Sequence, residues 1–406
     1  MRRVTFSRNY TLSLSRTCRC YCKYCAFATH SAHLYSPAEV ERQLGDAERR
    51  GVKELLVLTG ERPEVNAEVA RLLAEYGHAD FTSYVAWACE RALERGLLPH
   101  TNIGVLDAGE LARLREVTAS QGLMLESVSE RLMETVHAGS PTKHPEARLA
   151  TIRAAGELRI PFTSGILVGV GESAEERIAS LAALAELQRE HGHIQELILQ
   201  NYVPHPDYYG REPALIADAA QHGGDDPEDP GAAAAGERAE PEPLPDWATP
   251  ISLDDMRSLV RECRRLMPDV GIQIPPNLSD WWLPLVDEGA TDLGGLSANG
   301  DHISPEHPFP SPHVMRKRLQ PRGYALTERL CVYPRYMGPA WIDQGVLDVI
   351  KNRYWSFIPR RGSGRREERQ IRSDLVAGAI ERARAGEPLS EDELTALFAE
   401  TRPGAI

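Results

Sequence analysis

The sequence predicts an α/β fold, a (β/α) barrel that is partly or fully closed. Short apolar segments alternate with segments of helical periodicity along most of the chain. Such alternation favours parallel strands joined by right-handed helical crossovers. The chain has 406 residues, 42% of them hydrophobic, which suffices for one large barrel domain or for two smaller domains. The continuous alternation favours the barrel, whose chemistry we expect at the carboxyl ends of the strands.

The individual elements follow in a regular order. Apolar or β-rich runs predict strands at residues 10–14, 54–58, 97–102, 122–126, 160–168, 194–201 and 271–274, with a further strand end at 291–295. Helical periodicity and capping residues predict helices from Ser36-Pro37, at 65–76 and 84–95, from Ala108, and at 148–158, 174–191 and 252–267. The cysteine-rich segment at residues 17–25 therefore forms a loop between a strand and a helix.

Two segments interrupt or follow this pattern. We expect a barrel domain at residues 1–343, interrupted at 206–250 by an acidic, low-complexity insertion that is disordered. For this insertion a surface loop is favoured over a lid. Residues 344–406 are expected to form a basic linker and a helical tail. The tail is predicted to be helical because Ser390 to Glu393 has the form of a capping box. A solvated linker is favoured over a docking surface for its arginines: Arg360, Arg361, Arg365, Arg366 and Arg369.

Composition narrows the function classes. The formal net charge of −13 argues against binding to nucleic acid. No apolar run reaches the roughly 20 residues that span a membrane, and no signal-peptide core follows the first residues. Seven cysteines without the spacing of a disulfide framework suit a reducing compartment. We therefore expect a cytoplasmic protein that acts on a small molecule.

Three cysteines carry the strongest chemical signal. Cys18, Cys22 and Cys25 stand in a C-x3-C-x2-C spacing, and short runs of cysteine thiolates hold iron–sulfur clusters. Three ligands on a [4Fe–4S] cluster leave one iron open to a substrate or cosubstrate. A zinc site is the alternative, but zinc motifs usually have four ligands in two pairs. Cys20 is a crowded fourth ligand, so we interpret it as a spectator.

The cysteine motif, with Tyr24 before its last member, resembles the signature of the radical S-adenosylmethionine (radical SAM) enzymes. The resemblance implies a partial or closed TIM-like barrel, a [4Fe–4S] cluster and S-adenosyl-L-methionine bound to the open iron. Gly165, Gly169 and Glu172 resemble the strand-five pattern of that superfamily, with Leu167 in place of isoleucine. The residues that the resemblance assigns to the cofactor are Tyr24, Thr59, Gly60, Glu61, Glu126, Gly165, Gly169, Glu172, Gln200 and Tyr202.

Longer stretches resemble one family, the 7,8-didemethyl-8-hydroxy-5-deazariboflavin (FO) synthases. They are residues 98–106, 122–127, 137–143, 161–169, 192–196, 275–278 and 302–310, the last matching the pattern that closes the family's barrel. The resemblance runs from about residue 5 to residue 343, apart from the insertion.

That family implies a tyrosine-derived adduct of a ribityl-diaminouracil as the small-molecule substrate, with ammonia released on ring closure. It also implies a partner radical SAM enzyme that supplies the adduct and a reductant protein such as ferredoxin or flavodoxin. The matching stretches supply these substrate-binding candidates: His100, Asn102, His137, Ser140, Lys143, Thr163 and Asn277. No catalytic residue is assigned. The adduct-forming partner, a menaquinone-pathway relative and a non-catalytic iron–sulfur or zinc protein remain alternatives.

Overall fold

The structure is a computed structural model that describes residues 2–204, 244–304 and 307–358, residue 376, and residues 378–386 and 388–398. The chain divides into two compact units, Met1–Arg353 and Tyr354–Ile406. The first unit contains the barrel, and the second contains helix α13 (Glu391–Phe398). Within the described residues, no helix is both long and apolar enough to cross a bilayer.

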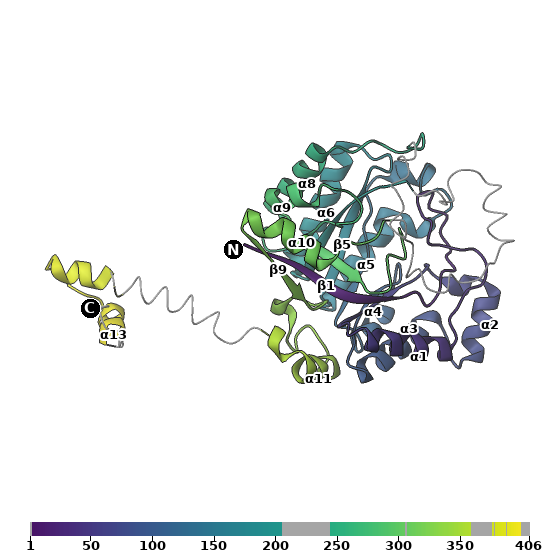
Figure 1. Ribbon diagram of the computed structural model, residues 1–406, viewed down its shortest axis with the longest axis horizontal. Helices are drawn as coiled ribbons and strands as arrows, with labels where there is room; N and C mark the ends of the chain where they lie inside the picture. The colour runs from purple at the N-terminus through teal and green to yellow at the C-terminus, as the bar shows by residue number, and fades with distance from the viewer. Residues whose placement is uncertain are drawn as a thin grey trace. The chain divides into compact units, whose positions relative to one another are not determined.

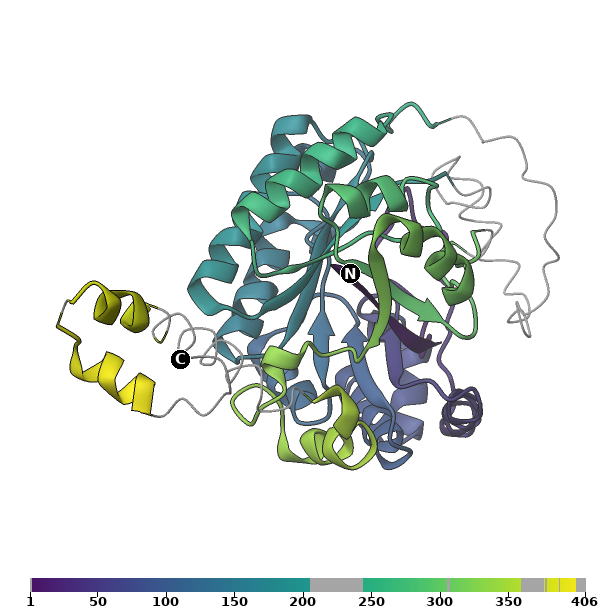
Figure 2. The ribbon, with the colours of Figure 1, turned by 60° about the vertical axis from the view of Figure 1, so that its left-hand side comes forward.

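Eight parallel strands of the first unit form a closed barrel, as the sequence predicts (Figure 1, Figure 2). They are β1 (Arg2–Leu12), β2 (Glu54–Leu58), β3 (Leu98–Asn102), β4 (Ser120–Gly122), β5 (Phe162–Val168), β6 (Ile194–Asn201), β7 (Gly271–Gln273) and β8 (Asp292–Ser297). Each strand pairs with the next along the chain, and β1 pairs with both β2 and β8. The β8–β1 pairing therefore closes the barrel.

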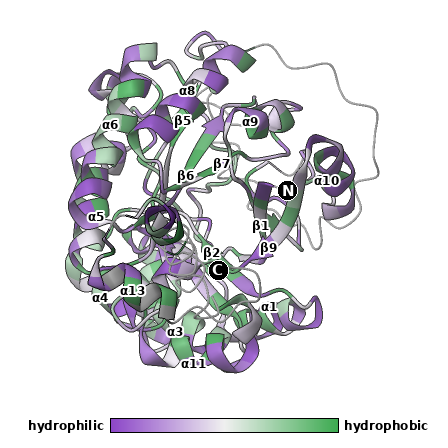
Figure 3. Ribbon diagram, turned by 90° about the vertical axis from the view of Figure 1, so that its left-hand side faces the viewer, coloured by the Kyte–Doolittle hydropathy of each residue, from purple (hydrophilic) through white to green (hydrophobic). Residues whose placement is uncertain are grey.

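Helices surround the strands (Figure 3). They are α1 (Pro37–Arg49), α2 (Ala67–Glu75), α3 (Phe81–Glu94), α4 (Ala108–Arg115), α5 (Pro145–Glu157), α6 (Ala174–His191), α8 (Leu253–Leu266), α9 (Trp282–Glu288), α10 (Pro312–Leu319) and α11 (Gln344–Arg353). Capping boxes begin α1, α3, α4, α6 and α8, and each satisfies backbone N–H groups that the first turn leaves free. The predicted α6 and β6 have the observed bounds.

Side chains alternate between the barrel interior and the layer beneath the helices. On β2, Leu55 and Val57 are fully buried in the hydrophobic core. Glu54, Leu56 and Leu58 instead line the interior cavity. The helices therefore pack on the apolar outer face of the sheet, while the inner face is free to bind a ligand.

Strand β9 (Tyr324–Arg329) is absent from the sequence prediction. It pairs in parallel with the first half of β1, from Arg2 opposite Tyr324 to Ser7 opposite Arg329. The chain then crosses the amino-terminal end of the barrel, where the Cys331 carbonyl accepts hydrogen bonds from Ser120 and Gln195, each at 2.9 Å. Residues 330–333 thus form the floor of the barrel.

The stretch at residues 302–310 does not close the barrel by strand pairing. Its described residues follow β8 as a loop, and Ile303, Ser304 and Phe309 line the interior cavity. The predicted strand at 122–126 is also shorter than expected, because only β4 and one bridge between Glu126 and Ile166 are formed. In both places residues that were predicted to pair in the sheet line the cavity instead.

The two unusual segments of the sequence are only partly described. Residues 206–243 of the predicted insertion lie outside the described residues, as do all five arginines named for the basic linker. The end of the insertion is described: Trp247 packs against Tyr202 with ring centroids 5.2 Å apart, and the Thr249 N–H donates to the Gly169 carbonyl. In the second unit, Ser390 and Glu393 form the predicted capping box at the start of α13.

Candidate active site

One cavity of about 400 Å³ extends through the barrel interior from the cysteine loop to the floor. Most residues predicted for the site line it: Cys18, Cys22, Cys25, Tyr24, Thr59, Gly60, Glu61, His100, Asn102, Glu126, Lys143, Thr163, Gln200, Tyr202 and Asn277. Five others lie behind this lining: His137, Ser140, Gly165, Gly169 and Glu172. The cavity therefore brings together residues that the sequence separates by more than a hundred positions.

The cysteine loop is held against the end of β2. The Glu61 N–H donates to Cys18 Sγ at 3.2 Å, and the Arg19 N–H donates to the Glu61 carbonyl at 2.9 Å. Gly60 makes this contact sterically possible, because a Cβ atom there would lie 2.1 Å from the Thr17 carbonyl oxygen. Gly60 thus fixes the loop, whereas the resemblance assigned it only to the cofactor.

The cysteine thiols fit an iron–sulfur cluster better than a zinc ion. Among the described residues, no three His, Cys, Asp or Glu side chains converge closely enough to hold one metal ion. A cubane cluster makes a different demand, because each thiolate binds its own iron. Cys18, Cys22 and Cys25 at one end of the cavity supply such a donor set. Cys20 also lines the cavity, and its Sγ lies 3.0 Å from Thr142 Oγ1.

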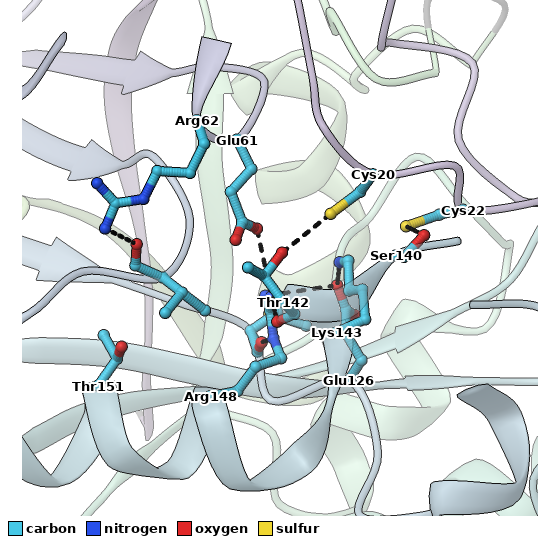
Figure 4. A network of polar contacts seen from close by, with 12 residues as sticks. Cys20, Cys22, Glu61, Arg62, Glu126, Ser140, Thr142, Lys143, Arg148 and Thr151 are labelled. Atoms are coloured by element: carbon cyan, nitrogen blue, oxygen red, sulfur yellow. Dashed lines mark hydrogen bonds and ion pairs between the residues drawn. The ribbon is translucent and has the colours of Figure 1, made fainter. Parts of the chain in front are cut away.

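A buried charged network lies beside the cysteine loop (Figure 4). Lys143 Nζ contacts Glu126 Oε1 at 2.6 Å, and Arg148 lies 3.9 Å from Glu126 and 3.7 Å from Glu61. Burial disfavours the charged forms of both Glu126 and Lys143. The cations nevertheless lower the pKa of Glu126, and that carboxylate raises the pKa of Lys143. The pair is therefore ionised, with Arg148 as a cation that the sequence prediction missed.

Glu61 has an acceptor atom available for a ligand. Its side chain is buried at the cavity wall, and Oε1 has no hydrogen-bond partner among the described residues. A buried carboxylate oxygen without a donor is costly. The ammonium group of a bound amino-acid moiety would satisfy it, which fits the cofactor role predicted for Glu61.

His137 and Ser140 support the cysteine loop from outside the cavity. Ser140 Oγ accepts from the Tyr21 N–H at 2.8 Å, and His137 Nε2 lies 3.3 Å from the Tyr24 hydroxyl. Burial, with a smaller contribution from Lys143, lowers the pKa of His137 to about 3. His137 is therefore neutral and buried against Tyr24, outside the cavity lining, and its contact with the substrate stays a prediction.

The strand-five pattern also acts behind the cavity wall. A Cβ atom on Gly165 would lie 2.3 Å from the Ile198 carbonyl oxygen, so this glycine allows β5 and β6 to pack. Glu172 accepts from the N–H groups of Gly169 and Val170 at 2.7 and 2.8 Å and pairs with Arg177 at 2.7 Å. These residues shape the turn after β5, and in this structure they do not line the cavity.

His100 presents a hydrogen-bond acceptor to the cavity. Ser120 Oγ donates its single proton to the Cys331 carbonyl, and His100 Nδ1 lies 2.7 Å from the same oxygen. Nδ1 must therefore carry the proton that joins it to Ser120. Burial and the nearby Arg329 lower the pKa of His100 to about 4. Its Nε2 atom is consequently unprotonated at neutral pH.

The floor of the cavity contains charged residues that sequence reasoning missed. Arg329 donates to Asp292 at 2.6 and 2.9 Å and to Glu196 at 2.6 Å. Burial opposes ionisation of Asp292, but Arg329 outweighs it and lowers its pKa, whereas burial raises the pKa of Glu196 well above its usual range. Glu54 and Asn9 line the same floor. Only β1 offered a sequence signal, because Ser7, Asn9 and Thr11 place a polar residue at every second position of that strand.

Comparisons with known proteins agree with this geometry. The family model of the radical SAM superfamily matches residues 12–184. The 7,8-didemethyl-8-hydroxy-5-deazariboflavin synthase of Archaeoglobus fulgidus is 39% identical over 355 residues, which cover 86% of this chain and 97% of that protein. The synthase of Methanothermobacter thermautotrophicus is 38% identical over 363 residues, with 87% and 99% coverage.

Two solved structures share the fold. The FeFe-hydrogenase maturase HydG from Carboxydothermus hydrogenoformans superposes with a TM-score of 0.58 at 18% identity, over 87% of this chain and 75% of that chain. Methylornithine synthase superposes with a TM-score of 0.53 at 17% identity, over 80% and 84% of the two chains. At these identities the likeness concerns the barrel alone.

The family assignment rests on the sequence relatives. Identity of 37–39% extends over nearly the whole length of several of them, and the radical SAM match covers the cysteine motif. Radical SAM membership implies a [4Fe–4S] cluster and S-adenosylmethionine, which the three thiols and the unpartnered Glu61 oxygen fit. The chain therefore belongs to the 7,8-didemethyl-8-hydroxy-5-deazariboflavin synthase family of the radical SAM superfamily.

Proposed function

We propose that the protein converts 5-amino-5-(4-hydroxybenzyl)-6-(D-ribitylimino)-5,6-dihydrouracil into 7,8-didemethyl-8-hydroxy-5-deazariboflavin, releasing ammonia, 5′-deoxyadenosine and methionine. This is a carbon–nitrogen lyase reaction of the ammonia-lyase type. The observation that carries the proposal is the barrel cavity with three cysteines at one end and polar barrel residues along its length. The names of the relatives supply the product, and the resemblance of the sequence to their family supplies the substrate.

The residues near the cysteine loop have separate tasks in this proposal. Cys18, Cys22 and Cys25 would hold the cluster, and Glu61 would accept from the methionine ammonium. When bound, the cluster and S-adenosylmethionine supply the 5′-deoxyadenosyl radical that removes a hydrogen atom from the substrate. The ionised Lys143–Glu126 pair offers fixed charges to polar groups in the cavity, and fixed dipoles and charges act strongly where water is excluded.

His100 supplies an acceptor for a substrate proton. Aromatisation of the tricycle releases protons from ring atoms, and a group that takes them must be unprotonated and inside the cavity. His100 Nε2 meets both conditions, since its pKa is lowered to about 4 and Nδ1 is engaged with Ser120. We assign His100 the role of hydrogen-bond acceptor or base toward the substrate.

Two protein partners belong to the same proposal. The adduct is supplied by a partner radical SAM enzyme that joins tyrosine to the ribityl-diaminouracil. The cluster receives its electron from a reductant protein such as ferredoxin or flavodoxin.

The test is an anaerobic assay of the reconstituted full chain. The partner enzyme, tyrosine, the ribityl-diaminouracil, S-adenosylmethionine and a reductant are added, and 5′-deoxyadenosine and deazaflavin fluorescence are measured together. Both products should appear, and a Cys22→Ser variant should yield neither. No 5′-deoxyadenosine from the wild type refutes the radical chemistry. 5′-Deoxyadenosine without deazaflavin refutes the substrate.

A further inference from the structure

Two buried acceptor atoms at the cavity floor have no hydrogen-bond partner among the described residues. They are Glu54 Oε2 and Asn9 Oδ1. The side chains are nine-tenths or more buried, since Glu54 is 6% exposed and Asn9 is 3% exposed, and both line the cavity. Native proteins rarely leave such atoms unsatisfied. A ligand that carries hydrogen-bonding groups is therefore expected at this place.

The two residues are direct neighbours on adjacent strands. Asn9 on β1 pairs with Glu54 on β2 in the sheet register. Gly295 on β8 leaves room for the Asn9 side chain, because a Cβ atom on Gly295 would lie 2.3 Å from Asn9 Nδ2. The strands thus place two acceptors side by side on the inner surface of the barrel.

Arg329 lies at the floor but makes no direct bond to Glu54. The donors of Arg329 go to Asp292, to Glu196 and to the Leu330 carbonyl. Within the described part of the chain Glu54 has no ion pair. Burial raises its pKa, and its remaining partners are the Ser7 and Asn9 side chains. Glu54 is therefore free to bond to a ligand in either protonation state.

The distance of Glu54 and Asn9 from the cofactor end of the barrel determines which part of the substrate can reach them. Glu54 begins β2, and Thr59 follows the end of that strand. Five residues at about 3.3 Å each span roughly 16 Å along the strand, which is roughly 13 Å along the axis of a barrel whose strands tilt by about 36°. The atoms that react must lie near the cofactor at the upper level, so the floor receives a part of the substrate that does not react.

We propose that Glu54 and Asn9 form a subsite for the polyol chain of the substrate. This inference rests on the proposed function, in which the substrate and the product both carry a ribityl chain. Each hydroxyl group both donates and accepts, so a polyol satisfies the Asn9 oxygen and satisfies Glu54 whether or not it is protonated. An apolar or purely accepting group would leave the Asn9 oxygen unsatisfied.

The test compares two ligands on the cluster-containing full chain. One is 7,8-didemethyl-8-hydroxy-5-deazariboflavin, and the other has the same ring system with a methyl group in place of the ribityl chain. Anaerobic equilibrium dialysis with fluorescence of the free ligand gives both dissociation constants. The proteins are the wild type, Glu54→Leu, the nearly isosteric Glu54→Gln and the control Gln121→Met.

The wild type should bind the ribityl ligand more tightly than the methyl ligand. Glu54→Leu should reduce that preference about tenfold, and Glu54→Gln only about threefold, because glutamine keeps a hydrogen-bonding group at this place and leucine does not. Gln121 Oε1 is also buried without a partner among the described residues but lies outside the cavity lining. Gln121→Met should keep the wild-type preference.

Three outcomes would overturn the subsite. They are a wild type without preference for the ribityl ligand, Glu54 variants that keep the full preference, and a loss of affinity that is equal for both ligands. Circular dichroism verifies folding, and Glu54→Gln keeps the test valid where Glu54→Leu fails to fold. Failure of the proposed function is recognised separately, because the wild type would then form no deazaflavin from the adduct.

Discussion

Replacing Arg329 with methionine removes the cation that holds the carboxylates of the barrel floor. Arg329 pairs with Asp292 and Glu196, and the three side chains are 7%, 0% and 5% exposed. Methionine fills similar space without a charge. The variant would therefore leave two buried carboxyl groups with their hydrogen-bonding partner removed.

The loss of stability follows from the burial of Arg329 and its two carboxylates. Breaking a buried ion pair from one side costs about 3–5 kcal/mol of unfolding free energy. The loss should depend on pH. Without Arg329, burial raises the pKa of Asp292 above its unfolded value, as it already does for Glu196. An acid with a raised folded pKa destabilises the fold as pH rises, by up to about 1.4 kcal/mol per pH unit and group.

Urea unfolding of the cluster-free proteins at pH 8 and pH 5.5 measures both effects. The Arg329→Met variant should lose about 3–5 kcal/mol at pH 8 and distinctly less at pH 5.5. Arg71→Met is the control, because Arg71 pairs with Glu68 and Glu75 on the exposed face of α2, where ion pairs contribute little. A loss below about 1 kcal/mol at pH 8, or an equal loss at both pH values, would refute the reasoning.

Three further predictions concern the cysteine loop and the cavity wall. Gly60→Ala should abolish most cluster binding, because its Cβ would meet the backbone of the cysteine loop; iron and sulfide analysis measures this, with Gly338→Ala, which has open space around it, as the unaffected control. His100→Ala should lower deazaflavin formation at least tenfold with cluster content intact, and unchanged turnover would exclude His100 from the site. Cys20→Ser should leave cluster and activity largely intact, since serine keeps the contact with Thr142; loss of the cluster absorbance would show that Cys20 is a ligand.

Much of the barrel was predictable because its signals are local. The periodicity of α6 and the apolar run of β6 lie within single segments of the chain, and their bounds agree with the structure. The capping residues Ser36 and Ser252 mark helix starts in the same way. Elements that are defined by their own residues are therefore visible in one sequence.

Strand β9 could not be found in this way. Its residues are mostly half-buried, and its sequence from Tyr324 to Arg329 mixes polar and apolar residues. Only the pairing with β1 makes it a strand. Arg329 and the floor were missed for the same reason, because their role depends on contacts between distant segments.

For the site residues, the sequence indicated their location but not the direction of their side chains. Cysteine spacing and strand ends correctly indicated which residues gather near the cavity. They did not show which side chains face it: Glu172 binds the N–H groups of its own turn, and His137 binds Tyr24. Side-chain direction at a strand end depends on the loop that follows, and the sequence pattern does not specify that geometry.

Strand β1 is made first but pairs with β8 and β9, which are made last. This order has a consequence for synthesis of the protein. Ser7 finds its partner Arg329 only after nearly the whole barrel has left the ribosome. At about 5–20 residues per second, this interval lasts on the order of tens of seconds. During that time one edge of β1 has unpaired backbone groups, which is the kind of edge that other chains can pair with. We expect folding of the nascent chain to be slow and to benefit from chaperones until β8 and β9 arrive.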